Sequence, residues 1–288
     1  MRKRQLCERG AGLLFALCGL TAVACLGAVT LYLTFNGLPA LFKVGPRAFL
    51  LGTEWAPTAS TPSFGILPFI LTTLWGTAAA LILGVPPGIL CALYLTKYAP
   101  SKVRALLDQV INLLAGIPSV VYGLVGMMVL VPAVADFFDL PDGSGLLSAT
   151  LLLAVMIFPT VVKLASDSLD AVPRHYEEAS LALGATKAET YLRVTLPAAK
   201  SGLAASVVLG AGRAAGEAMA VMMVAGNAPN FPGWFESVRF LTAAAASEMS
   251  YASGLHRQAL FSAALMLFLF IMALNGLLNR LMKGGKGR

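Results

Sequence analysis

The composition of this chain places it among membrane proteins. Of its 288 residues, 58% are hydrophobic and only 12% are charged, and the mean hydropathy is +0.78. Soluble domains carry about a quarter charged residues, so a water-soluble globular domain is excluded. The net charge of +7 is spread along the chain rather than gathered beside aromatic residues, which argues against a nucleic-acid partner.

The cysteines and histidines favour neither a disulfide framework nor a metal site. No CxxC or Cys/His spacing joins the four cysteines, which are Cys7, Cys18, Cys25 and Cys91. We interpret them as small buried hydrophobic residues. His175 and His256 are isolated, so we expect neither a metal nor a cofactor in this chain.

The first apolar run predicts an uncleaved membrane anchor. A basic leader, residues 1–10, precedes an apolar run at 11–35. This run is longer than the core of a typical signal peptide, and no A-x-A cleavage site closes it. We expect residues 36–64 to form an external loop.

Five further runs reach the roughly 20 apolar residues that a membrane-spanning helix needs. They occupy residues 65–95, 110–135, 146–165, 201–226 and 259–282. Proline and glycine at 84–88 and 115–119 predict kinks, which neighbouring helices can accommodate. The expected architecture is therefore all-α, with an anchor helix, a core of five spans over 65–282, and a basic tail at 283–288.

Lysine and arginine predict the orientation of these spans. With a cytoplasmic N-terminus, the inner segments hold the basic residues of 2–9, 97–104, 163–200 and 280–288. The outer segments hold only four: Lys43, Arg47, Arg239 and Arg257. Because cytoplasmic loops carry the excess of Lys and Arg, we expect both termini to face the cytoplasm.

The segment between the fourth and fifth runs, 167–200, predicts two short helices. Pro173 suits the start of the first helix and Gly184 its end. Thr186, followed three residues later by Glu189, is a capping-box pattern for the second helix, which Pro197 would stop. These signals alone leave open whether the segment is an ordinary interhelical loop or a docking element.

A motif in this segment resembles the EAA signature of ABC importer permeases of type I (MetI-like) architecture. Glu178-Ala179-Ser180 is followed by Gly184 and, after nine residues, by Val194-Thr195-Leu196-Pro197. The resemblance implies a coupling helix that docks on a cytoplasmic ATPase through Glu178, Ala179, Gly184, Leu196 and Pro197. The chain has no GxxxxGK[ST] phosphate loop, so we expect no enzyme activity of its own and ATP use by the partner.

Further stretches resemble the PstC-type permeases of phosphate importers. They include GIPSVVYGLVG at 116–126 and GRAAGEAMAVMMVAGN at 212–227, and the likeness extends over about residues 45–280. It implies a multi-pass protein of the bacterial plasma membrane that works with a PstA-type permease, a PstB-type ATPase dimer and a PstS-type binding protein. One departure is Ala218, where the family commonly has threonine. A companion permease, or a permease for sulfate or molybdate, stays open.

Two charges within the fifth run are the candidate site. A charge at mid-membrane costs about 2.5–3.5 kcal/mol on insertion scales, so it faces a bundle interior or a wet cavity. As members of one helix, Arg213 and Glu217 would lie at i and i+4 and could pair. Gly212 and Gly216 would let a second helix approach closely. The pair is either a structural ion pair or part of a phosphate path in which Arg213 binds the anion and Glu217 promotes release.

Weaker hypotheses concern other polar and aromatic residues. Ser119 and Tyr122 could donate hydrogen bonds to an anion, or could belong to a buried kink. Trp55 and Trp234 are interpreted as interface anchors. The outer loop 227–258, with Phe231, Phe235 and Phe240 among its aromatic residues, would contact a binding protein or form a plain surface segment.

Two rival classes are weighed against the importer. An intramembrane enzyme would need convergent catalytic groups in the spans, where Arg213 and Glu217 are the only central charges expected. An autonomous channel or ion-coupled transporter would need no ATPase dock.

Overall fold

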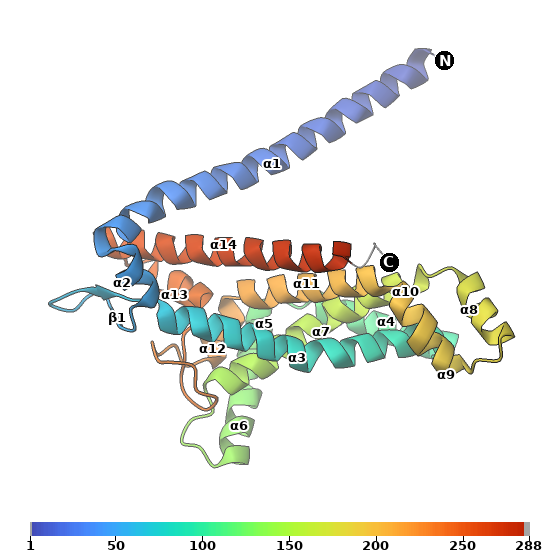
Figure 1. Ribbon diagram of the computed structural model, residues 1–288. Coiled ribbons are helices and arrows are strands. Elements are labelled where there is room, and N and C mark those ends of the chain that lie inside the picture. The colour runs from blue at the N-terminus through green and yellow to red at the C-terminus, as the bar shows by residue number, and fades with distance from the viewer. Residues whose placement is uncertain (1, 285–288) are drawn as a thin grey trace.

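The computed structural model of the chain describes residues 2–284 and shows a helical protein with one small hairpin (Figure 1). The chain begins with α1 (Arg2–Val44), α2 (Pro46–Leu51), β1 (Trp55–Ala56) and β2 (Ser63–Phe64). Then follow α3 (Leu67–Lys97), α4 (Ser101–Gly116), α5 (Ser119–Val125), the π-helix η1 (Gly126–Leu130) and α6 (Val131–Phe138). The second half contains α7 (Leu146–Asp170), α8 (Arg174–Ala182), α9 (Lys187–Thr190), the π-helix η2 (Tyr191–Thr195) and α10 (Leu196–Ala198). It ends with α11 (Lys200–Gly216), α12 (Met219–Val224), α13 (Leu241–Glu248) and α14 (Gly254–Gly284). The predicted tail lies outside these residues from position 285, as do the side chains of the leader up to residue 9.

Within residues 2–284, five helices are long and apolar enough to cross a membrane, and a bent pair brings the number to six. The single spans are Gly10–Val44, Leu67–Lys97, Ser119–Phe138, Leu146–Asp170 and Gly254–Gly276. The bent pair joins Lys187–Ala198 to Lys200–Gly216 at an angle of 69°. The predicted all-α, six-span architecture is confirmed when this pair counts as one span.

The centre of the bundle is the packing of α3 against α7, with α11 covering both. A Cβ added at Gly84 would come within 3.0 Å of the carbonyl oxygen of Ala154 and of the Ile157 side chain. A Cβ at Gly88 would come within 2.9 Å of Val161. The glycines of the predicted kink region therefore allow α3 to lie close to α7, in the manner of small-residue contacts between membrane helices. The predicted kink prolines, Pro86 and Pro87, remain inside the continuous helix α3.

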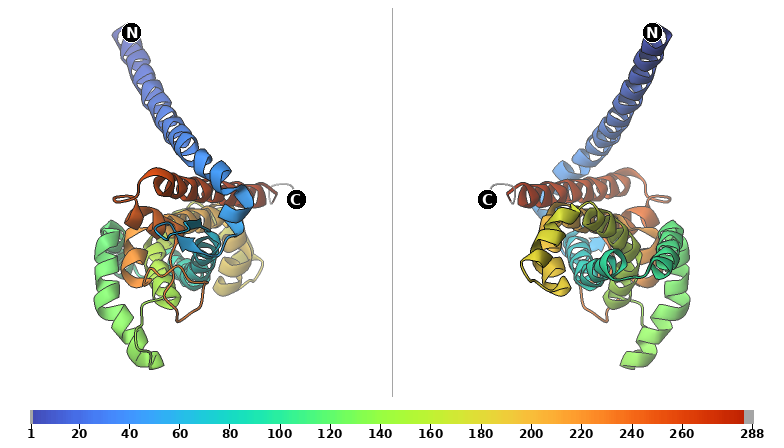
Figure 2. Two further views of the ribbon diagram at one scale, coloured as in Figure 1. Left: turned by 90° about the vertical axis from the view of Figure 1, so that its left-hand side faces the viewer. Right: turned by 90° about the vertical axis from the view of Figure 1, so that its right-hand side faces the viewer.

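The first helix joins the bundle at its C-terminal end alone. It continues through Pro39 to Val44, so the predicted external loop begins nine residues later than expected, at Gly45. Its last turns contact α14, whereas the rest of α1 leaves the bundle (Figures 1 and 2). Cys18 and Cys25 are exposed on that free part, and their interpretation as buried residues is wrong for the single chain because no other helix of it covers them.

The third predicted span, 110–135, is wrong in its boundaries. Helix α4 ends at Gly116, and the chain extends through Ile117 before α5 begins at Ser119. Pro118 explains the break, because proline lacks a backbone N–H and disfavours helical dihedrals in the residue before it. The crossing segment is therefore Ser119–Phe138.

The two ends of the bundle carry different structures (Figures 1 and 2). The hairpin and α2 lie at one end, and α8 and α9 lie at the other (Figure 1). The N-terminal end of α1 and the C-terminal end of α14 both extend toward the end with α8 (Figure 1).

The helices predicted in the segment 167–200 are present. Gly184 follows α8 with φ +87°, which glycine adopts without strain. The predicted capping box joins Thr186 and Glu189, and hydrogen bonds from Thr186 hold the pKa of the Glu189 carboxyl below its ordinary value. Pro197 does not stop the second helix. It lies inside α10, where the preceding π-turn removes the need for its missing N–H, and the chain bends after it at Ala199.

We expect a bulky residue at Gly84 to destabilise the bundle. Gly84→Leu would push against the Ala154 carbonyl, which cannot move independently of α7, and such overpacking costs about 1–3 kcal/mol. A thermal melt in detergent should show a lower Tm. Gly19→Leu is the matched control, because nothing lies within 4 Å of a Cβ there. Equal melting of the two variants would contradict this account of the α3–α7 contact.

Candidate functional site

Arg213 lines an open groove between α7, α11 and α14. It lies three residues before the end of α11, and its Nη1 donates a hydrogen bond to Oγ1 of Thr160 in α7 at 3.3 Å. The groove has a volume of about 530 Å³ and is otherwise mainly apolar. Its lining residues are Thr160, Leu164, Ala205, Val208, Leu209, Gly212, Arg213 and Asn275.

The chemistry of this groove is that of a single guanidinium in an apolar wall. Its other polar lining groups are the Thr160 hydroxyl and the Asn275 amide. A guanidinium carries five N–H donors in a planar fork, and the bond to Thr160 uses one of them. The remaining donors suit the oxygens of an oxyanion, which Arg can bind in a bidentate manner.

Glu217 does not share a helical face with Arg213, and the predicted i, i+4 pairing is wrong. Helix α11 ends at Gly216, and Glu217 is extended with ψ 126°. Its Oε1 instead accepts a hydrogen bond from the backbone N–H of Ala220 at 3.0 Å. A carboxylate at the start of a helix satisfies a free N–H and interacts favourably with the helix dipole. Glu217 therefore stabilises the start of α12, and none of the ion pairs described for residues 2–284 joins it to Arg213.

The break between α11 and α12 is held from α13 as well. The buried Thr242 hydroxyl donates to the backbone oxygen of Glu217 at 2.6 Å. One residue earlier, the Leu241 N–H donates to the Thr73 hydroxyl of α3 at 3.0 Å. The predicted continuous helix 201–226 is thus replaced by two helices whose junction is bonded to a third.

The structure places Tyr122 beside this junction but gives its hydroxyl a structural partner. Tyr122 packs in the same buried cluster as Ala214 and Ala220. Its hydroxyl donates to the Leu114 carbonyl at 2.8 Å, across the break before α5. Ser119 is half-buried at the first turn of α5. The kink interpretation therefore fits Tyr122, and the role of Ser119 in anion binding stays a prediction.

The glycine pair of α11 is open. Nothing lies within 4 Å of a Cβ added at Gly212 or Gly216, whereas Gly210, on another face, packs on Val161. The predicted close approach at Gly212 and Gly216 therefore has no partner helix in this chain, and it stays a prediction about a second subunit.

The residues of the EAA-like motif gather at the end of the bundle opposite the hairpin (Figure 1). Glu178 and Ala179 are exposed on α8, Gly184 forms the turn after it, and Leu196 and Pro197 lie in α10. Glu178, Ala179, Gly184 and Pro197 are exposed, whereas Leu196 is half-buried and packs against the core.

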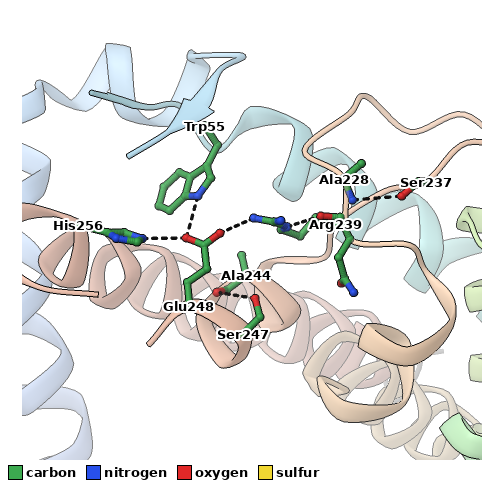
Figure 3. A network of polar contacts seen from close by, with 9 residues as sticks. Trp55, Ala228, Ser237, Arg239, Ala244, Ser247, Glu248 and His256 are labelled. Atoms are coloured by element: carbon green, nitrogen blue, oxygen red, sulfur yellow. Dashed lines mark hydrogen bonds and ion pairs between the residues drawn. The ribbon is translucent and has the colours of Figure 1, made fainter. Parts of the chain in front are cut away.

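A buried polar network lies at the hairpin end of the bundle and was not predicted from the sequence (Figure 3). Glu248, at the end of α13, accepts hydrogen bonds from Trp55 Nε1 at 3.0 Å and Arg239 Nη1 at 2.5 Å, and it bonds His256 Nε2 at 2.8 Å. Arg239 also donates to the backbone oxygen of Asn227 at 2.7 Å. The carboxylate thus joins β1, the loop before α13, and α14.

This network corrects several predictions about the outer segments. Trp55 is 7% exposed and bonded, so its role as an interface anchor is wrong, whereas Trp234 is exposed. Phe240 is buried at 1% against α3 rather than lying on a surface loop. The segment 227–258, predicted to be an outer loop, contains the helix α13. The alanine-rich sequence of α13 shows neither the pattern of an amphipathic surface helix nor the length of a membrane span. In the described part of the chain, no group of three or more His, Cys, Asp or Glu could hold a metal ion.

Comparison with protein families decides the class. Residues 84–284 match the family described as the binding-protein-dependent transport system inner membrane component. The chain belongs to this family. It is a multi-pass permease of the inner membrane, and its function is transport.

Relatives match the permease over most of its length. It is 38% identical to a probable ABC transporter permease protein, YqgH, of Bacillus subtilis, over 97% of this chain and 93% of that protein. It is 34% identical to the phosphate transport system permease protein PstC of Pasteurella multocida, over 91% and 88% of the two chains. The PstC protein of Haemophilus influenzae is 32% identical, over 95% and 93%.

Solved structures share the fold of the permease. A chain of an inward-facing MetNI methionine ABC transporter matches with a TM-score of 0.62 and 18% identity, over 76% of this chain and 95% of that one. A chain of a bacterial alginate ABC transporter, in complex with an alginate-bound periplasmic protein, matches with a TM-score of 0.64 and 16% identity, over 93% of each. The MetI-like architecture predicted from the sequence is confirmed.

The geometry at Glu217 predicts different effects for two substitutions. Glu217→Gln keeps an oxygen that can accept from the Ala220 N–H, so we expect little change in Tm. Glu217→Ala removes the acceptor and should cost about 1 kcal/mol, as for other helix-start residues. Thermal melts of both variants in detergent measure this. A Gln variant as unstable as the Ala variant would show that the charge, and not the hydrogen bond, matters.

Loss of the buried carboxylate at Glu248 should destabilise the permease strongly. Glu248→Ala leaves Arg239 buried without its partner, and breaking a buried ion pair in this way costs about 3–5 kcal/mol. Trp55→Phe removes a single donor and should cost about 1 kcal/mol. Thermal melts in detergent, with Ser247→Ala as a neighbouring control, test whether Glu248→Ala lowers the Tm more than Trp55→Phe does. A Glu248→Ala melt equal to that of the control would contradict the role of this network.

Proposed function

We propose that this permease is the PstC-type subunit of an ATP-driven phosphate importer. The proposal is supported by the PstC relatives at 32–34% identity and by the resemblance of residues 116–126 and 212–227 to that group. The observation that carries it is Arg213, a guanidinium with free donors in the wall of a groove between three spans. Phosphate oxygens are the ligands that this planar fork fits well.

The proposed path runs along the Arg213 groove and the open face of α11. Since no described atom lies within 4 Å of a Cβ added at Gly212 or Gly216, a PstA-type permease would cover that face and close the path. Anion release needs weak binding. Because Glu217 is bonded to Ala220 and not to Arg213, we assign the weakness of the site to the small number of polar groups around the guanidinium.

The proposed partners and orientation follow from the two ends of the bundle. A PstB-type ATPase dimer would dock on α8 in the cytoplasm, and a PstS-type binding protein would deliver phosphate at the hairpin end. The N-terminal end of α1 and the C-terminal end of α14 extend toward α8 (Figure 1). Lys97 ends α3 and Lys187 begins α9 at that end, and cytoplasmic segments carry the excess of Lys and Arg, so we place both termini in the cytoplasm.

A second candidate keeps the transporter and changes the cargo to sulfate or molybdate. One observation favours it: Ala218 lacks the hydroxyl that PstC-type permeases commonly have at this position. A single guanidinium does not by itself distinguish tetrahedral oxyanions.

Uptake into proteoliposomes tests the proposal. The permease, with a companion permease, ATPase and binding protein, should import radiolabelled phosphate when ATP is present, and sulfate and molybdate should compete poorly. Arg213→Gln should assemble and hydrolyse ATP but lower uptake by about tenfold or more, the worth of a hydrogen bond to a charged group.

The control is Lys102→Gln, which removes an exposed cation from the first turn of α4, outside the groove. It should import as the wild type does. Normal phosphate uptake by Arg213→Gln would remove Arg213 from the path. A wild-type preference for sulfate or molybdate would reject phosphate as the cargo.

A further inference from the structure

The helix α8, which carries the motif glutamate, has no buried side chain. An exposed helix of nine residues gains little from burial and is too short to be stable by itself. Its position therefore depends on polar contacts to the rest of the chain. Two of its side chains make them: Glu177 and Ser180.

Glu177 bonds two elements at once. Its Oε1 lies 2.6 Å from Nζ of Lys97, the last residue of α3, and accepts from the Thr195 hydroxyl of η2 at 3.0 Å. The side chains of Lys97 and Glu177 are 12% and 17% exposed. The neighbouring Glu178 is exposed, so the two adjacent glutamates differ: one faces the bundle and one faces outward.

The ion pair is placed where both helix dipoles favour it. Lys97 occupies the last turn of α3, and Glu177 occupies the first turn of α8. A cation at a helix C-terminus and an anion at a helix N-terminus each interact favourably with the macrodipole. The shielding from water also weakens screening by salt.

The chain itself connects α8 to two spans. The linker 171–173 leads back to α7, and α9 and α10 lead on to α11. Span α3 has no such covalent link, although it packs closely along α7 through Gly84 and Gly88. The Lys97–Glu177 pair adds a direct connection from α8 to the end of α3.

We propose that Glu177 is a positioning residue that makes α3 move together with α8 when the ATPase acts. The proposal rests on the proposed function in one respect, that α8 docks an ATPase, and it holds whatever the cargo. Rigid elements that share contacts move as one body. Without the pair, a displacement of α8 would reach α7 and α11 through the chain itself and would reach α3 only through its packing against α7.

Spin labels on α3 and α8 test this directly. The four cysteines are replaced by serine, and labels are placed at Leu90→Cys and Ala182→Cys, both exposed positions. The full complex is measured without nucleotide and with a non-hydrolysable ATP analogue. We expect a narrow distance distribution that is unchanged by nucleotide, and in Glu177→Gln a broader one that shifts with nucleotide.

The control is Asp136→Asn, which removes an exposed carboxylate of α6, outside the coupling segment, and should keep the narrow distribution. Glutamine at position 177 has the size of glutamate and keeps an acceptor for Thr195, so folding should be retained. The same distribution in Glu177→Gln as in the wild type would overturn the proposal, as would equal broadening in Asp136→Asn.

A second test exchanges the charges of Lys97 and Glu177. It measures the number of ATP molecules hydrolysed for each solute molecule imported. Lys97→Glu and Glu177→Lys should each raise this ratio by roughly fivefold or more, the lower range of coupling between sites. The double exchange should lower it again, though not fully, because its charges oppose the helix dipoles. A double variant no better than either single one would overturn the pairing.

These outcomes separate the two proposals. The spin-label distances need ATP-analogue binding and no phosphate. If the wild-type complex imports sulfate instead of phosphate, the proposed cargo fails, and the distances and the ratio, measured with sulfate, still decide the role of Glu177.

Discussion

Helix breaks inside an apolar bundle constrain this permease more than any other feature. Backbone N–H and C=O groups that leave a helix in the membrane must find partners within the protein. At the junction of α11 and α12, the Glu217 carboxylate accepts from Ala220 and its backbone oxygen accepts from Thr242. Two helices therefore have to meet at this point, α12 for the carboxylate and α13 for the carbonyl, and Arg213 is left at the edge of the junction in an open groove.

The same constraint explains where the charges lie along the bundle. Glu248 joins the hairpin, the outer loop and α14 at one end, and Glu177 joins α3, α8 and η2 at the other. Glu177 holds α8, which has no buried side chain of its own, whereas Glu248 joins elements that already share a buried apolar cluster. Arg213 differs, because its partner is one threonine hydroxyl at 3.3 Å. The contrast between two well-paired carboxylates and one sparsely paired guanidinium favours structure at the ends and solute contact in the groove.

The sequence predicted the spans and the motif helix because these depend on local signals. Apolar length indicated the number of crossings, although the third begins at Ser119 and the fifth is a bent pair. Gly184 with the Thr186–Glu189 box located the turn and cap after α8. The break at Glu217 could not be predicted, because GRAAGE has the composition of a helix and its interruption is stabilised by Thr242, 25 residues away. The Glu248 network depends in the same way on residues as distant as Trp55, and no spacing rule brings them together.

Ser180 and Ala218 depart from the family pattern, and the fold shows where each of them lies. Ser180 stands where the motif commonly has alanine, and its hydroxyl lies 2.9 Å from that of the buried Thr190. An alanine could not make this bond, so α8 is tied to α9 more firmly here than the motif requires. Ala218 places no hydroxyl at the junction before α12, and it does not line the groove. The chain thus combines a firmly held α8 with a groove whose polar groups besides Arg213 are those of Thr160 and Asn275, so any oxyanion affinity there depends mainly on Arg213 itself.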